Sequence, residues 1–243
     1  MGLKSCFGVS MDGIKHKHMH IFNNSESLEL LKNGNDMFYR KEKMPKFEKI
    51  EVVSLEAKRL KVYANLSKIT FVELAMAEPE MIIKFYGQGR YNDHKPTITV
   101  VQVENEIRIK EKYSGGSFVG NLAIDIIVPK GFMYSNVTIK SIFGDIEGYV
   151  RTKFLRIDTL SGDTQIQLEG KGLTINTLSG NVEMRFKARG KGYFNIDTVN
   201  GNIDLTLDNV SDVFVNGEKS RVLREKYPLQ IVYSNVNGSL KIR

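Results

Sequence analysis

Residues that crosslink or rigidify a chain are scarce in this sequence. Cys6 is the one cysteine among 243 residues, which excludes an internal disulfide framework and any cysteine-rich zinc site. Tryptophan is absent and proline occurs only five times. Glycine, in contrast, occurs 21 times, and threonine, isoleucine, valine and asparagine are plentiful in the second half. That composition is what β-strands and tight turns require.

Long apolar segments are also missing. No run approaches the eighteen or so residues of a membrane-spanning helix. Near the start, Asp12, Lys15 and His16 interrupt the apolar stretches, so no secretory signal is predicted. The opening MGLKSC nearly matches a myristoylation signal, but its sixth residue is cysteine instead of serine or threonine. We therefore predict a cytoplasmic protein, with association with the cell envelope as the alternative.

The positive charge is distributed unevenly along the chain. The formal net charge is +7. Residues 139–215 carry nine basic and ten acidic side chains, whereas residues 216–243 carry six and two. A nucleic-acid-binding protein typically has a dense basic stripe with interleaved aromatic residues, and no such stripe is visible along the sequence. Nucleic acid is therefore not a predicted partner.

A seven-residue phrase occurs three times. IDTLSGD at 157–163 returns as INTLSGN at 175–181 and as IDTVNGN at 196–202. The equivalent first positions follow at intervals of 18, 18, 21, 19 and 18 residues: Ile139, Ile157, Ile175, Ile196, Val215 and Tyr233. A glycine stands five residues later in every unit except that of Val215, where Ser220 takes its place: Gly144, Gly162, Gly180, Gly201 and Gly238.

Each unit contains two short stretches of alternating apolar residues, one on either side of the glycine. Alternation places every second side chain on one face of a strand, and a lone unit cannot bury that face. Stacked units can, because each adds a layer, or rung, to a shared interior. The repeat therefore predicts an all-β fold, a β-solenoid (β-helix) with about 18–21 residues per rung.

Polar residues of the repeat also align in columns. We expect their amides, carboxylates and hydroxyls to hydrogen-bond between rungs, and we expect the corner glycine to supply a positive φ or to allow a close backbone approach. One column holds acidic and amide side chains and the other holds threonines: Asp158, Asn176 and Asp197, and Thr159, Thr177 and Thr198.

The chain divides into three predicted stretches. Residues 1–45 form an N-terminal extension, 46–135 form irregular β coils, and 136–243 form the regular rungs. Residues 25–43 are the one candidate helix, which could begin at Ser25 and would cover an open end of the solenoid. Within the irregular part, RLKVYANLSK at 59–68 reads as an early rung.

The stretch LAIDIIVPKGFMYSNVTIKSIFGDIEG at 122–148, followed by the TLSGD-type units, resembles the DUF4097 family, labelled "putative adhesin". Close relatives of that family are the head domains of auto-transporter adhesins. The resemblance runs from about residue 50 to 243 and is strongest over 122–207. It implies a single-stranded right-handed β-solenoid, mostly bacterial, often attached to cell-envelope or envelope-stress proteins. It names no ligand.

The phrase HKHMH near the start is a candidate metal site. On a strand, His16, His18 and His20 would share one face, and imidazole suits zinc, copper or nickel. Ligands two residues apart on a strand, however, lie nearly 7 Å apart, too far to converge easily on one ion. We therefore predict neither a metal site nor a cofactor.

Four aspartates are the candidates for catalysis. Enzymes built on β-solenoids use clustered carboxylates for acid–base work on polysaccharides, and Asp158, Asp163, Asp197 and Asp204 could supply them. Each falls in or beside a repeat column, where turn chemistry explains it. We therefore predict a non-catalytic binding or scaffold module, with a carbohydrate-active enzyme on the same scaffold as the alternative.

The rung between Ile175 and Ile196 is three residues longer than its neighbours. Its extra length falls in RFKARGKG, where four cations alternate with smaller or apolar residues: Arg185, Lys187, Arg189 and Lys191. We predict a basic loop that binds an anionic partner, against the simpler interpretation of a solvated bulge. The predicted partners are a protein, a glycan or an anionic membrane surface, together with self-association through the ends of the solenoid.

Overall fold

The computed structural model describes residues 16–19, 46–91, 95–112, 118–222 and 226–243. Every regular element in these ranges is a β-strand, and the seventeen strands form one continuous hydrogen-bonded sheet. The first eight are β1 His16–Met19, β2 Lys46–Ser54, β3 Arg59–Ala64, β4 Lys68–Leu74, β5 Glu80–Tyr91, β6 Thr97–Val103, β7 Glu106–Lys112 and β8 Phe118–Pro129. The others are β9 Tyr134–Ser141, β10 Ile146–Ser161, β11 Thr164–Ser179, β12 Val182–Asn200, β13 Ile203–Asp208, β14 Val210–Val215, β15 Glu218–Val222, β16 Tyr227–Asn237 and β17 Leu240–Ile242.

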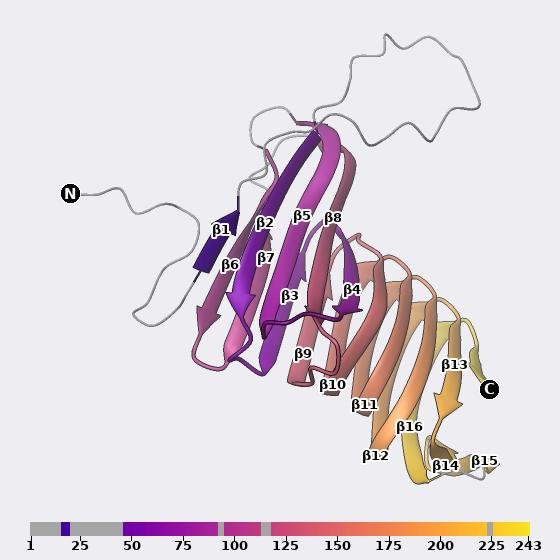
Figure 1. The fold of residues 1–243 in the computed structure, drawn as a ribbon. Coiled ribbons are helices and arrows are strands. Elements are labelled where there is room, and N and C mark those ends of the chain that lie inside the picture. The colour runs from indigo at the N-terminus through magenta and orange to yellow at the C-terminus, as the bar shows by residue number, and fades with distance from the viewer. Residues whose placement is uncertain (1–15, 20–45, 92–94, 113–117, 223–225) are drawn as a thin grey trace, which may run out of the picture.

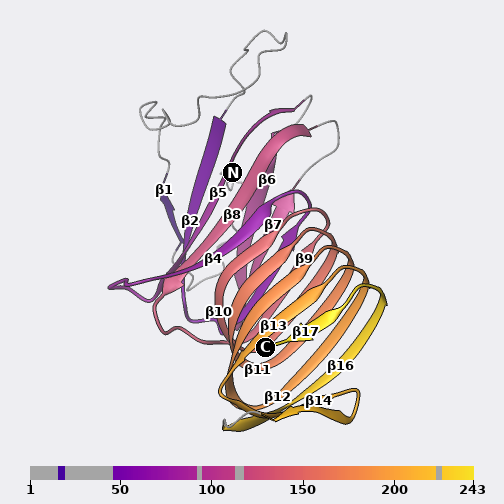
Figure 2. The same ribbon diagram turned by 90° about the vertical axis from the view of Figure 1, so that its right-hand side faces the viewer.

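The sheet folds over into two layers because β10, β11 and β12 are long enough to bend. Their second parts join layer A, whose strand order is β6–β7–β3–β9–β10–β11–β12–β16–β14–β15. Their first parts join layer B, with the order β1–β2–β5–β8–β4–β10–β11–β12–β13–β17. Figure 1 shows the rungs as a row of parallel strands, and Figure 2 shows their nested bends.

The predicted rungs stack in register through the middle of the chain. In layer A, Ile157 pairs with Ile139 on one side and with Ile175 on the other, and Ile175 pairs with Ile196. All four isoleucine side chains are fully buried. In layer B, Thr164 lies between Ile146 and Val182 in the same way. The β-solenoid predicted from the repeat is confirmed over these rungs.

The predicted rung at Val215 is wrong. Ile196 pairs directly with Tyr233, and Val215 pairs with Ile231 on the far side of β16. The cause is local: Asn216 and Gly217 both have positive φ, 50° and 88°, which closes a tight hairpin between β14 and β15. The hairpin lies outside the column of rungs, so the chain returns with β16 and β17 to complete the stack on β12 and β13.

The early part of the chain also enters the stack out of sequence order. In the segment 59–68, Leu60 and Val62 pair with Val137 and Ile139, which confirms that segment as a rung. On the other side β3 pairs with β7, and β4 pairs with β8. The rung formed by β3 and β4 therefore lies between β7–β8 and β9–β10, and the flanking β2–β5, β5–β8 and β6–β7 pairs are antiparallel. The predicted helix at 25–43 lies outside the described residues.

The corners where layer A leads into layer B form the glycine edge of the solenoid. Gly162 and Gly180 have φ values of 125° and 128°. A Cβ on Gly180 would lie 2.2 Å from the backbone oxygen of Gly162, and one on Gly201 would lie 2.0 Å from that of Gly180. Both expectations for these glycines are therefore confirmed, since the corner needs the positive φ and leaves no space for a side chain.

A ladder of side chains runs along the same edge. The backbone N–H of Asp163 donates to Oδ1 of Asp145 at 2.9 Å, and that of Asn181 donates to Oδ1 of Asp163 at 2.8 Å. Asn202 continues the ladder at 3.1 Å. The column of acidic and amide side chains bonds between rungs as expected, since Asn176 donates to Asp158 on the neighbouring rung at 2.6 Å. The threonine column differs from the expectation, because the hydroxyls of Thr159 and Thr177 donate to carbonyls of their own rung.

Candidate functional site

The four aspartates considered for catalysis are each engaged in the repeat. Asp163 belongs to the ladder of the glycine edge. Asp204 forms an ion pair with Arg243, and Asp197 accepts a hydrogen bond from Asn195 at 3.2 Å. Asp158 pairs with Arg156 at 2.9 Å. Burial would raise the pKa of the Asp158 carboxyl, but hydrogen bonds from Arg156 and Asn176 outweigh burial and lower it. A general acid of a glycosidase requires a raised pKa, so the lowered pKa of Asp158 does not fit that role.

The four cations of the predicted basic loop lie on β12 itself. The extra residues of this rung form a bulge between Ala188 and Tyr193, opposite Gly170 and Gly172 of β11. Arg185 is paired with Asp208 at 2.7 Å, and Arg189 is paired with Glu169. Lys187 and Lys191 are exposed and form no ion pair within the described part of the chain. Their binding role stays a prediction.

Cations recur where layer B bends into layer A, on the side opposite the glycine edge. Lys153 lies between Thr152 and Phe154, and Lys171 lies between Gly170 and Gly172. The β10–β11 register pairs these flanking residues, so the two lysines are neighbours. On an earlier rung the backbone N–H of Ser135 donates to the carbonyl of Lys58 at 2.7 Å. We call the resulting row of exposed cations the lysine edge: Lys58, Lys153, Lys171, Arg189 and Lys191.

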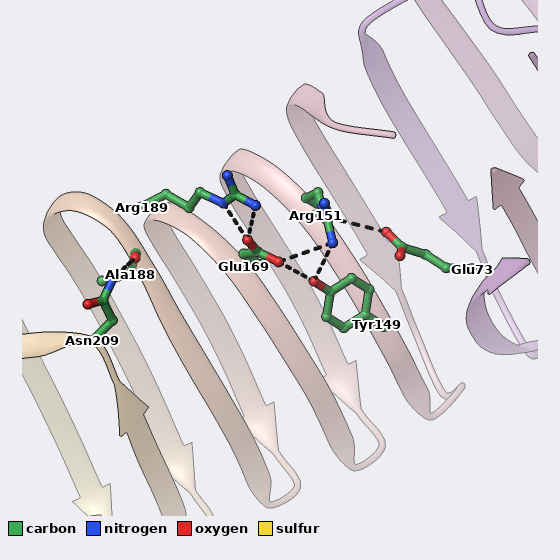
Figure 3. Close-up of polar contacts among 7 residues, drawn as sticks. All are labelled: Glu73, Tyr149, Arg151, Glu169, Ala188, Arg189 and Asn209. Carbon is green, nitrogen blue, oxygen red and sulfur yellow. Dashed lines mark hydrogen bonds and ion pairs between the residues drawn. The ribbon is translucent and has the colours of Figure 1, made fainter. Parts of the chain in front are cut away.

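A buried carboxylate anchors the lysine edge. The side chain of Glu169 is only 3% exposed. Its Oε1 accepts from Arg189, and its Oε2 accepts from the hydroxyl of Tyr149 and pairs with Nη2 of Arg151 at 3.2 Å. Nη2 of Arg151 also donates to the Tyr149 hydroxyl at 3.1 Å. Figure 3 shows these groups converging on the carboxylate across three neighbouring rungs.

The surroundings of Glu169 keep it ionised. Burial alone would raise the pKa of its carboxyl, but hydrogen bonds from Tyr149 and Arg189 and the charges of Arg151 and Arg189 lower it below its ordinary value. Burial and the hydrogen bond to Glu169 raise the pKa of the Tyr149 hydroxyl. At neutral pH, Tyr149 is therefore a neutral donor and Glu169 an anion.

Two further contacts extend this cluster along the bend. Oε1 of Glu73, on β4, lies 3.6 Å from Nε of Arg151 and connects the earliest of these rungs to β10. On the other side, the side-chain amide of Asn209 donates to the carbonyl of Ala188 at 2.9 Å (Figure 3). Of the cations near the bend, Arg151 and Arg189 are paired with Glu73 or Glu169. The cations near the bend are Arg151, Lys153, Lys171, Lys187, Arg189 and Lys191.

The sequence prediction identified Arg189 and Lys191 but missed the residues that complete the edge. Lys153, Lys171 and the acceptor Glu169 lie outside the basic segment. A signal was available, because Lys153 and Lys171 are 18 residues apart, which is the rung interval. Tyr149 and Glu73 had no such signal, since their role depends on which side chains the bend brings together.

The histidine phrase is only partly covered by the structure. His16 and His18 lie on β1, whose backbone pairs with β2, and His20 lies outside the described residues. Among the residues that are described, no group of three or more histidine, cysteine, aspartate or glutamate side chains is placed to hold a metal ion. Nor does that part of the chain contain a helix long and apolar enough to cross a membrane.

The family model described as Toastrack DUF4097 matches residues 48–220. The chain belongs to the Toastrack DUF4097 family. The match covers most of the stack and both of its edges, and β16 and β17 extend the stack beyond the matched residues. The family resemblance seen in the sequence is therefore confirmed. A comparison with curated proteins gives no match.

Three solved structures resemble this Toastrack chain. A "putative cell adhesion protein" from Clostridium sporogenes has a TM-score of 0.50 at 16% identity, covering 82% of this chain and 99% of its own. A "putative adhesin" from Bacteroides fragilis has a TM-score of 0.37 at 12% identity, covering 81% and 97%. A "Putative lipid binding protein" from Parabacteroides distasonis has a TM-score of 0.26 at 10% identity, covering 81% and 97%. The first likeness shows a shared fold.

Proposed function

We propose that this Toastrack protein is a non-catalytic binding module that holds an anionic ligand along its lysine edge. The observation that carries the proposal is the row of Lys153, Lys171 and Lys191 on successive rungs. None of the three forms an ion pair with another described residue. Rungs lie about 4.8 Å apart, so the charges are close enough to act together on one ligand.

A row of like charges is unfavourable unless something offsets it. Glu169 neutralises part of the positive charge, and it is already shared by Arg151, Arg189 and the Tyr149 hydroxyl. The lysines therefore remain available to an external anion. Arg189, which is held by Glu169, also restricts the motion of the edge. A restricted edge loses less conformational entropy when a ligand binds.

The comparisons support a binding role in a general way. The adhesion and lipid-binding names of the structural neighbours fit a module that contacts cell-surface material, and such material is often anionic. They also fit the envelope-associated alternative for its location. The engagement of Asp158, Asp163, Asp197 and Asp204 in the repeat argues against the enzyme alternative.

The proposal is tested with a variant in which Lys153, Lys171 and Lys191 are replaced by glutamine. Binding of the wild-type chain to a polyuronate, to vesicles containing phosphatidylglycerol and to polyglutamate is measured by calorimetry and sedimentation at low and high salt. We expect at least one of these anions to bind, and we expect salt to weaken that binding because charge provides the attraction.

The matched control replaces three other exposed lysines by glutamine, namely Lys110, Lys112 and Lys241, which lie away from the bend. It has the same net charge as the test variant. We expect the lysine-edge variant to lose binding and the control to retain it. Equal loss in both variants would reduce the effect to net charge and would refute the lysine edge as the site.

A further inference from the structure

Beside the lysine edge, the outer surface of layer A has a hollow of about 180 Å³. Phe154 and Tyr193 line it, and Gly172 pairs with both on the rung between them. The two aromatic residues are 51% and 50% exposed. Two rung spacings separate their backbones by about 9.6 Å. The Phe154 ring lies over Gly172, since a Cβ on that glycine would be only 2.5 Å from Cδ1 of Phe154. The hollow is therefore a shallow slot, with the Phe154 ring over its middle rung and Tyr193 on the next rung.

Polar side chains border the slot on the adjoining column. Thr138, Arg156 and Thr174 line this side and lie on successive rungs. Arg156 is paired with Asp158, and the threonine hydroxyls are suited to a ligand that carries hydroxyls. Pockets that enclose a whole small ligand measure roughly 300–1,000 Å³. The slot is smaller and suits one ring of a longer molecule.

The slot and the lysine edge run side by side. Lys153 directly precedes Phe154, and Lys171 directly precedes Gly172. A polymer that follows the edge across β10, β11 and β12 would therefore meet one lysine per rung that is unpaired among the described residues, about every 4.8 Å, with an aromatic surface alongside. A chain of 1,4-linked uronic acids has one carboxylate per ring, and one ring with its glycosidic oxygen is about as long as one rung spacing.

We propose that the slot binds a sugar ring of an acidic polysaccharide of the uronic acid class, whose carboxylates lie along the lysine edge. The C–H face of the ring would rest on Tyr193 and Phe154, because aromatic faces carry negative charge and attract weakly positive C–H groups. This inference rests on the proposed function, since the same cations hold the polymer. It adds the ligand class and the residues that recognise the ring.

Other anions fit this surface less well. Single-stranded nucleic acid also combines charge with stacking, but its stacked backbone carries one charge per about 3.4 Å, which is shorter than the rung spacing. An acyl chain of a lipid would offer the hydroxyls of Thr138 and Thr174 no hydrogen-bond partner in the slot. A ring with hydroxyls satisfies those groups.

The deciding experiment measures binding of oligogalacturonate to the full chain by calorimetry. A neutral cello-oligosaccharide, oligothymidylate and phosphatidylglycerol vesicles are compared with it. The test variant is Tyr193→Ala, and Phe143→Ala is the control, because Phe143 is 60% exposed and lies at the glycine edge. We expect Tyr193→Ala to weaken oligogalacturonate binding by about tenfold or more, as loss of a stacking contact does, and Phe143→Ala to leave it unchanged.

Tyr193→Leu keeps apolar bulk at this position and guards against misfolding of the alanine variant. We expect it to weaken binding as well, because the aromatic face is lost. If oligogalacturonate binds and depends on the lysines but not on Tyr193, the slot is refuted and the proposed function stands. Preferred binding of oligothymidylate or vesicles would likewise refute the slot and leave the proposed function in place. If none of the anions binds the wild-type chain, both proposals fall.

Discussion

The two edges of the solenoid solve the same problem, reversing the chain between layers, in opposite ways. At the glycine edge, each rung turns at a glycine with no space for a Cβ, and a ladder of side chains satisfies the backbone. At the lysine edge the strands bend without breaking, and one rung accommodates three extra residues there. The glycine edge therefore sets the register, which leaves the lysine edge free to vary in length and charge.

The strongest test of this contrast is Gly180→Ala. The new Cβ would lie 2.2 Å from the Gly162 carbonyl oxygen at a φ of 128°. We expect a loss of about 3–5 kcal/mol in the free energy of unfolding, measured by denaturant titration. Gly217→Ala in the β14–β15 turn is the control, because its φ is 88° but nothing lies within 4 Å. It should cost only about 1–2 kcal/mol, and an equal loss would show that φ alone matters.

The next largest effect is expected at the anchor of the lysine edge. Glu169→Gln keeps the shape of the side chain but removes the charge that Arg151 and Arg189 face. We expect a loss of about 2–3 kcal/mol in unfolding free energy, less than for a fully buried pair because Arg189 is half exposed. Glu183→Gln, an exposed change on the neighbouring strand, should have almost no effect. Equal losses would contradict an anchoring role.

Acid should reproduce part of this loss in the wild-type chain. The pKa of Glu169 is lowered on folding from its ordinary 4.5. Its contribution to stability is therefore complete above that value and disappears as pH falls through the lower folded pKa. We expect unfolding free energy measured against pH to fall more steeply below about pH 4.5 in the wild type than in Glu169→Gln. Parallel curves would mean that the Glu169 carboxyl is not stabilised by folding.

The smallest expected effect is at the exposed ladder of the glycine edge. Asp163→Ala removes the acceptor of the Asn181 N–H, but water can replace part of that bond. We expect a loss of about 0.5–1 kcal/mol in thermal or chemical unfolding. Asp163→Asn retains an acceptor oxygen and should be nearly neutral. A large loss with Asn would show that the charge, and not the hydrogen bond, matters at this edge.

The sequence predicted the rungs well where neighbours in the stack are also neighbours in the chain. The spacing of Ile139, Ile157 and Ile175 specifies such neighbours, because parallel stacking places equivalent residues on top of one another. The prediction failed at Val215, where a residue of suitable type stands at a suitable interval. The interval cannot distinguish a rung from a hairpin that leaves the stack, and the Asn216–Gly217 turn made the difference.

The candidate site was predicted only in part. Arg189 and Lys191 stood out in a basic segment, but Lys171 has no other basic residue near it in the chain, and the short run RTKFLR around Lys153 was not identified. No basic stripe is visible along the sequence, yet stacking builds one from single residues about eighteen positions apart. The slot between Phe154 and Tyr193 is formed in the same way, since Gly172 separates them only in the folded register.

The sequence by itself determined the solenoid, because alternating apolar residues and corner glycines repeat at an interval that only stacking can bury. Tertiary structure alone decided the order of the rungs at both ends, the pairing of Glu169 and the alignment of the lysines. The physical reason is that burial along one strand is a local property encoded residue by residue. Which strands become neighbours depends instead on which of several strands, distant from one another in the chain, pairs with a given open edge of the sheet.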